Sequence, residues 1–250
     1  MSYPVYNQNQ YPENNSQSRN SKLALYNPSK VTSRNDRNRF IAKVYSILTT
    51  QLVITSLYCS AVVASETLQE ALIQAYPLIY AAMILSFVVL LVLVCSQKAA
   101  KKVPLNYILL GTFTLLEAYI LGFICAFTDP VIVLVAALMT VGITGVLTLY
   151  AFKTKKDFTT MWAGLFVLVT VLFLFGFFMI FFYSYWLRLI YSLVAVIVFS
   201  IFIIFDTQLI AGGRYGELTY DDYVVGALIL YIDIVGLFIY LLSLLGGVKD

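Results

Sequence analysis

The sequence predicts an all-α polytopic membrane protein with seven transmembrane helices. Of its 250 residues, 61% are hydrophobic and 12% are charged, whereas soluble domains carry about 25% charged residues. From residue 41 onward the chain divides into apolar segments near the roughly 20 residues that cross a bilayer. Lipid offers no partner for unpaired backbone groups and the alternation of a barrel strand is missing, so these segments should be helices. We expect them at residues 42–64, 74–96, 105–127, 130–152, 158–182, 187–210 and 222–246.

Residues 1–40 are predicted to be a disordered polar and basic tail, followed by a seven-helix transmembrane domain over 41–250. The tail is rich in Asn, Gln, Ser, Tyr and Pro and lacks the apolar area that would offset its chain entropy. Its basic residues outnumber Glu13 and Asp36. They act either as a topogenic signal, which we prefer, or as an attraction to an anionic membrane surface.

Basic residues in the connections predict the orientation. "SQKAAKKVP" and "FKTKKD" carry three lysines each, whereas "ASETLQEA" and "FTDP" carry none. The positive-inside rule therefore places the N-terminus and these two basic connections in the cytosol. Charge hardly constrains the segment at 222–246, so it either crosses fully or re-enters.

Three acids lie inside the predicted segments: Glu117, Asp206 and Asp233. An intramembrane ionisable group is costly and usually faces a partner or a water-filled cavity. Asp206 and Asp233 enter from the same cytosolic face, at depths of about 6 Å and about 16 Å for straight helices. Tilt of the last segment, or a later start for it, would bring them within hydrogen-bonding reach. Glu117 is a candidate pore-lining acid for which the sequence indicates no partner.

If Asp206 and Asp233 meet, both cannot ionise cheaply, and the pair would titrate as a unit and act as a pH sensor and gate. When deprotonated, the same oxygens would suit a transient Ca²⁺ ion. In the alternative, Asp206 caps its helix near water while Asp233 bonds a neighbouring helix.

Several chemistries are excluded or disfavoured. The sequence has no histidine, and Cys59, Cys95 and Cys125 show no CxxC spacing, which removes His-based catalysis and the usual zinc sites. An intramembrane aspartyl protease would carry GxGD around its second aspartate, where this chain has "YIDIVG". We therefore expect no enzyme activity, no cofactor and no nucleic-acid partner.

The stretch "FDTQLIAGGRYGELTYDDYVVGALILYIDIVGLFIYLLSLLGG" at 205–247 resembles the C-terminal signature of the Bax inhibitor-1 family, in its lifeguard branch. "TLLEAYILGF" matches the glutamate of the family's third helix. The resemblance implies a central last helix surrounded by the other six. It also implies a pH-sensitive Ca²⁺ leak in which Asp206 and Asp233 match the proposed sensor. Some prokaryotic relatives place a counter-charge arginine in helix 2, and segment 74–96 has none.

Two functions stay open at this point. One is a pH-sensitive Ca²⁺ leak channel that modulates Ca²⁺ homeostasis and cell death or stress responses. The other is a non-conducting membrane interaction protein that regulates apoptosis or stress signalling. In both, the expected setting is the lipid bilayer of the endoplasmic reticulum, Golgi or vacuole, with Ca²⁺ or cell-death and stress-pathway proteins as partners.

Overall fold

The computed structural model describes residues 34–182, 184–212 and 218–246. All regular structure within these ranges is helical. The elements are α2 Arg34–Ala64, α3 Glu66–Gln74, α4 Pro77–Cys95, α5 Gln97–Lys101, α6 Leu105–Ala126, α7 Pro130–Lys153, η1 Phe158–Met161, α8 Trp162–Phe181, α9 Tyr185–Ala211, η2 Tyr220–Asp222 and α10 Tyr223–Gly246.

Seven of these helical stretches are long and apolar enough to cross a membrane, which confirms the predicted fold class. The last, Tyr220–Gly246, is long enough to span without re-entering. The prediction was wrong at the start of α2, which begins at Arg34 and not at 42. The tail prediction over 1–33 lies outside the described residues, whereas 34–40 are helical. The cause is tertiary, because Arg37 at this helix start contacts groups far along the chain.

Local chemistry sets several helix ends. Pro77 and Pro130 occupy the first turns of α4 and α7, where the missing N–H costs nothing. The carboxylate of Asp129 accepts a hydrogen bond from Val131 N at 2.8 Å and so caps α7. Gly212 follows α9 with φ of 93°, a left-handed conformation that stops a helix and favours glycine.

No separate helix was predicted between α2 and α4, and the structure contains α3 there. Ser65 caps it by accepting a hydrogen bond from Leu68 N. Because α3 occupies residues 66–74, the second spanning helix begins at Pro77, three residues after the predicted start.

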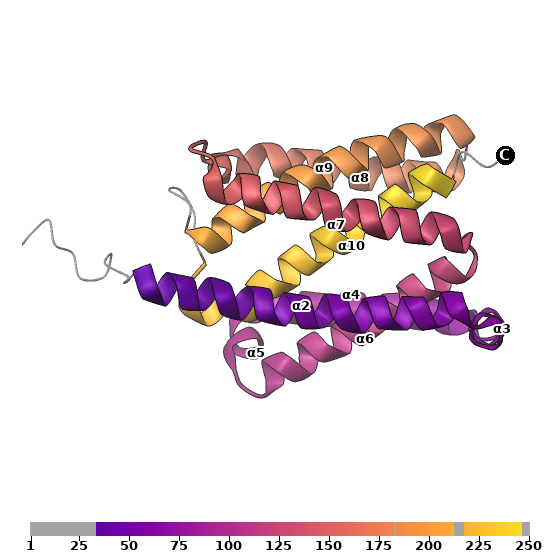
Figure 1. Ribbon diagram of the computed structural model, residues 1–250, viewed down its shortest axis with the longest axis horizontal. Coiled ribbons are helices and arrows are strands. Elements are labelled where there is room, and N and C mark those ends of the chain that lie inside the picture. Colours follow the sequence, from indigo (N-terminus) through magenta and orange to yellow (C-terminus); the bar gives the residue numbers. More distant parts are fainter. Residues whose placement is uncertain (1–33, 183, 213–217, 247–250) are drawn as a thin grey trace, which may run out of the picture.

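The helices form two groups with α10 running obliquely between them (Figure 1). One group contains α2, α4 and α6, and the other contains α7, α8 and α9. Helix α10 packs against α2 and α6 on one side and against α7 and α9 on the other. It is the most buried span, with 50% of its apolar window inside the protein against 11% for α8.

The expected arrangement of six helices around the last one stays a prediction. Four spanning helices pack substantially against α10, whereas α4 packs mainly against α6 and α8 mainly against α9. Helix α10 thus contacts helices of both groups, whereas α4 and α8 lie mainly against one neighbouring spanning helix each.

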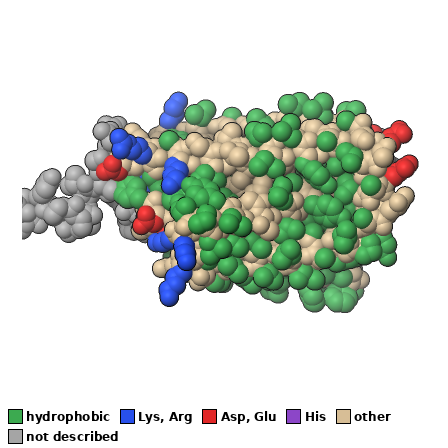
Figure 2. Space-filling model, turned by 90° about the horizontal axis from the view of Figure 1, so that it is seen from below, with side chains coloured by type: hydrophobic (Ala, Val, Ile, Leu, Met, Phe, Trp, Pro, Cys, Tyr) green, Lys and Arg blue, Asp and Glu red, His purple; other side chains and the backbone are tan. Residues whose placement is uncertain are grey.

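The surface has an apolar belt and two different ends. On the face shown in Figure 2, hydrophobic side chains cover the middle and Lys and Arg gather at one end. This end, called the basic end below, contains the start of α2 and the α4–α6 and α7–α8 connections. Its basic residues are Arg37, Arg39, Lys43, Lys98, Lys101, Lys102, Lys153, Lys155 and Lys156. The belt suits lipid, and the charge asymmetry is the one that the positive-inside rule uses.

Helices α9 and α10 form the most extensive helix pair and approach closely at Gly236. A Cβ atom added to Gly236 would collide with the ring of Phe199 on α9. Since small residues let membrane helices approach closely, Gly236 sets the spacing of α9 and α10 one turn away from Asp233.

We expect Gly236→Ala to lower stability, because the added methyl group must displace a packed ring. Overpacking of this kind costs about 1–3 kcal/mol. Thermal unfolding of the purified protein in detergent measures the loss. Gly145→Ala is the matched control, since a Cβ there meets nothing within 4 Å. Equal stability of the two variants would contradict the close approach.

Candidate functional site

The structure brings Asp206 and Asp233 together at the α9–α10 interface. Their side chains are close enough to interact, and both are buried, with exposed fractions of 7% and 5%. A hydrogen bond between two carboxyl groups needs a proton on one of them. Such a proton would join the side chains of Asp206 and Asp233 across the α9–α10 interface.

Helix direction explains how acids at different distances from their helix ends meet. Asp206 lies near the end of α9, whereas Asp233 lies in the middle of α10. Because α10 crosses the molecule obliquely (Figure 1), distance along its axis is not depth in the membrane. The tilt removes the offset of about 10 Å that straight helices would give.

The surroundings of the pair are poor in compensating groups. Within the part of the chain that the structure describes, neither carboxyl group has a lysine or arginine partner. Asp233 Oδ2 is buried without a hydrogen-bond partner among these residues. An unsatisfied buried oxygen is costly, so the site has unused capacity to accept a proton or bind a cation.

The pair by itself is a sparse metal site. No group of three or more His, Cys, Asp or Glu residues gathers within the described ranges. Ca²⁺ takes six to eight oxygen ligands, so two carboxyl groups would leave most of its coordination to water and backbone. Such a site suits brief occupancy by Ca²⁺ better than tight, long-lived binding of the ion.

Neighbouring residues fix α9 around the pair. Thr207, which is fully buried, has its hydroxyl 3.4 Å from Tyr45 OH on α2. Gln208 donates to Lys156 O at 2.9 Å and accepts from Phe158 N at 2.7 Å. These contacts tie the residues next to Asp206 to α2 and to the α7–α8 connection.

Glu117 lies away from the aspartate pair, in the group formed by α2, α4 and α6. It accepts a hydrogen bond from the hydroxyl of Ser86 on α4 and is partly buried on α6. The sequence indicated no partner for it, because a serine in an apolar segment is an unremarkable residue.

A second polar set in the same group was missed by sequence reasoning. Gln51 Nε2 donates to Thr114 Oγ1 at 2.9 Å, and the hydroxyls of Thr55 and Tyr231 lie 2.8 Å apart. All four residues are buried. Tyr231 and Asp233 are two residues apart on α10, so they point to different sides of it: Tyr231 toward α2 and Asp233 toward α9. The sequence feature that could have revealed this polar set is Gln51, an amide side chain within an apolar segment.

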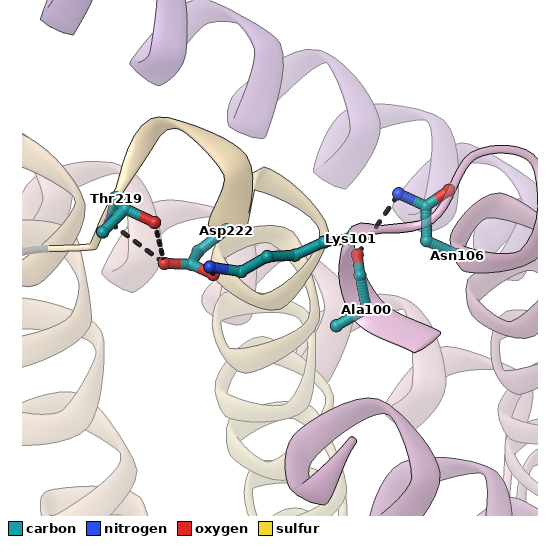
Figure 3. A network of polar contacts seen from close by, with 5 residues as sticks. All are labelled: Ala100, Lys101, Asn106, Thr219 and Asp222. Carbon is teal, nitrogen blue, oxygen red and sulfur yellow. Dashed lines mark hydrogen bonds and ion pairs between the residues drawn. The ribbon is translucent and has the colours of Figure 1, made fainter. Parts of the chain in front are cut away.

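A network of polar contacts joins elements at the basic end (Figure 3). Lys101 Nζ of α5 lies 3.0 Å from Asp222 Oδ1 at the start of α10. The other carboxylate oxygen of Asp222 accepts from Thr219 N at 3.1 Å and from the Thr219 hydroxyl. Asn106 donates to Ala100 O and to Tyr223 OH, each at 3.2 Å. The α4–α6 connection is thereby fastened to the beginning of α10.

The start of α2 closes the same end from another side. Arg37 Nη1 donates to Leu218 O at 2.9 Å and to Ile210 O at 3.4 Å, so it binds a carbonyl at the end of α9. Its guanidinium also lies over the rings of Phe40 and Tyr220. Lys43 lies 3.2 Å from the ring centre of Tyr223. These contacts explain why α2 starts earlier than its apolar segment.

The fold and the buried acids define a polytopic helical membrane protein with two neighbouring buried carboxyl groups between its last two spanning helices. The chain belongs to the Bax inhibitor-1 family, because the family described as "Inhibitor of apoptosis-promoting Bax1" matches residues 37–250. This confirms the resemblance found in the sequence.

Three curated relatives support the lifeguard branch. Protein lifeguard 3 of Homo sapiens is 34% identical over 233 residues, which cover 88% of this chain and 72% of the relative. Protein lifeguard 3 of Mus musculus is 34% identical over 234 residues, covering 89% and 73%. Protein lifeguard 4 of Mus musculus is 34% identical over 213 residues, covering 85% and 87%.

We expect the Thr55–Tyr231 contact to couple α2 to α10 energetically. Tyr231→Phe and Thr55→Val each remove one partner, and the double variant should lose less than the sum of the two. Hydrogen bonds between membrane helices contribute about 0.6 kcal/mol on average in such cycles. Unfolding of the four proteins in mixed micelles measures the coupling.

As a control, Thr55→Val is combined with Tyr80→Phe, at an exposed tyrosine of α4. The losses of unfolding free energy of these two variants should add. Additivity of Tyr231→Phe with Thr55→Val would contradict the coupling.

Proposed function

We propose that this protein is a pH-sensitive Ca²⁺ leak channel of an intracellular membrane, with Asp206 and Asp233 as its proton sensor and gate. The observation that carries the proposal is a carboxyl pair buried at a helix–helix interface without a basic partner among the described residues. A stable structural pair would be expected to have a counter-charge or full hydrogen bonding.

The gate works through the shared proton. While one proton is held between Asp206 and Asp233, the hydrogen bond joins α9 to α10. When that proton leaves, two negative charges face each other in a medium of low dielectric constant and repel strongly. The repulsion favours separation of α9 and α10 or entry of a cation.

Ca²⁺ is the cation that fits these oxygens. Carboxylates are hard ligands that Ca²⁺ prefers, and protons would compete with Ca²⁺ for the same atoms. The unpartnered Oδ2 of Asp233 is the first available ligand. Ca²⁺ is here the transported ion, and no cofactor is needed.

Low flux is expected from the number of acids on the path. Conduction needs sites that bind weakly enough to release the ion, and Glu117 is the further acid we assign to the pore lining. Its hydrogen bond to Ser86 holds it within the α2–α4–α6 group. There it would serve as a second cation-binding position, separate from the aspartate pair.

The cytosol is the proposed location of the N-terminus and of the basic end. The basic connections support this orientation through the positive-inside rule. Asp206, near the end of α9, would then sense cytosolic pH beneath the contacts made by Lys101 and Arg37. The membrane would be that of the endoplasmic reticulum, Golgi or vacuole.

A role in cell death follows from the leak. The family is described by its inhibition of apoptosis-promoting Bax1, and slow release of stored Ca²⁺ would modulate cell-death and stress responses. A non-conducting protein that acts through cell-death or stress-pathway partners is the alternative, and it predicts no ion flux.

We expect purified protein in liposomes that contain a Ca²⁺ dye to admit Ca²⁺ slowly, with influx rising from pH 5 to pH 8 as the pair loses its proton. Asp233→Asn and Asp206→Asn should each abolish or shift the pH midpoint, because an amide neither ionises nor shares the proton. Glu70→Gln, an exposed acid on α3, is the control and should keep the wild-type midpoint.

Absence of influx above empty liposomes at every pH would refute the leak and favour the non-conducting alternative. Influx in which the two asparagine variants keep the wild-type midpoint would refute the sensor alone.

A further inference from the structure

Two thiols meet where α2 and α6 pack together at the end of the bundle opposite to the basic end. Cys59 lies on α2, which ends at Ala64, and Cys125 is the penultimate residue of α6. Cys59 is therefore about 8 Å from its helix end at 1.5 Å per residue. Both thiols are thus placed near the membrane interface.

The two side chains are neighbours in the interior of the protein. Cys59 and Cys125 belong to the same buried core and are close enough to interact with each other. Both are free thiols in the structure. The third cysteine, Cys95, is exposed at the end of α4 on the basic side.

The backbones of α2 and α6 approach closely at the same level. A Cβ added to Gly122 would lie 2.5 Å from Tyr58 Cε1 and 3.4 Å from Val62 Cγ2. Gly122 and Cys125 are one turn apart on one face of α6, and Tyr58 precedes Cys59. A disulfide needs short distances between backbones, and Gly122 permits them.

We propose that Cys59 and Cys125 are a redox-active pair that closes into a disulfide joining α2 to α6. In the membrane this inference rests on the proposed orientation, which places the pair on the non-cytosolic, oxidising side. Cys95 then lies on the cytosolic, reducing side and stays a thiol.

The reaction is thiol–disulfide exchange with a small disulfide such as oxidised glutathione, or with a disulfide oxidoreductase. Cys59 is the first nucleophile, because 9% of it is exposed against 1% of Cys125. Its thiolate, after losing a proton to water, attacks one sulfur of oxidised glutathione and releases one glutathione thiolate. The thiolate of Cys125 then displaces the second glutathione from the mixed disulfide. Two thiols are oxidised and one glutathione disulfide is reduced to two glutathiones.

The bond would lock one half of the protein. Helix α2 carries Gln51 and Thr55, and α6 carries Thr114 and Glu117, so a covalent link would hold the second polar set and Glu117 in a fixed register. The α9–α10 interface would be untouched. Redox state would therefore act on the α2–α6 side independently of the proton shared by Asp206 and Asp233.

The test equilibrates the purified full-length protein with mixtures of reduced and oxidised glutathione and then traps free thiols with N-ethylmaleimide. Peptide mass spectrometry should find Cys59 linked to Cys125 within one chain, in wild type and in Cys95→Ser alike. Cys59→Ser and Cys125→Ser should lack the link while eluting like wild type in size-exclusion chromatography. Three labelled thiols at the most oxidising ratio, or links through Cys95, would overturn the pair.

Gly122→Ala tests the geometry without touching sulfur. The added methyl group pushes against Tyr58, so the oxidised-to-reduced glutathione ratio at half closure should rise about tenfold. Gly142→Ala, where a Cβ meets nothing within 4 Å, should leave the ratio unchanged. Equal ratios for both variants would contradict the close approach as the cause.

Trapping in native membranes then separates this inference from the proposed function. A Cys59–Cys125 link in rapidly alkylated cells supports native closure and the orientation together. A link that forms in purified protein but not in cells would refute native closure and the orientation on which it depends. The liposome flux experiment is unaffected by either result.

Discussion

The packing of α10 between two groups of helices is the constraint on which the rest of the protein depends. Half of its apolar window is inside the protein, and it contacts α2 and α6 on one side and α7 and α9 on the other. In lipid the hydrophobic effect does not drive helices together, so close packing and buried polar contacts must do so. Gly236 provides the close packing, and Tyr231 and Asp233 provide the buried polar contacts.

Tyr231 and Asp233 make different kinds of contact on the two sides of α10. Tyr231 makes a neutral hydrogen bond to Thr55, which needs no proton exchange and is satisfied in one state. Asp233 lies beside another acid, Asp206, and in the proposed function their contact depends on a proton that can leave. On that proposal one side of α10 is a fixed contact, while the other is a contact with two states. The proposed gate needs both, because α9 can only move relative to a helix that is held elsewhere.

The ends of the bundle are fastened by different chemistry. At the basic end, Lys101–Asp222 and Arg37 with the carbonyl of Leu218 are charge-assisted contacts near water, which salt weakens and which rearrange readily. At the opposite end, Cys59 on α2 and Cys125 on α6 belong to the same buried core, and the proposed link between them would be covalent. The proposed proton sensor, the ion pair and the proposed disulfide thus lie at separate places on one framework.

The sequence by itself determined the seven spanning helices and selected Asp206, Asp233 and Glu117 as candidates, because apolar length and rare charges are local properties of a chain. It placed the start of α2 too late, since Arg37 is held there by residues far along the chain. Tertiary structure alone decided that Asp206 meets Asp233, that Ser86 pairs with Glu117 and that Thr55 meets Tyr231. The physical reason is that nearly every position of these helices is apolar, so periodicity does not show which face turns inward or how far α10 tilts.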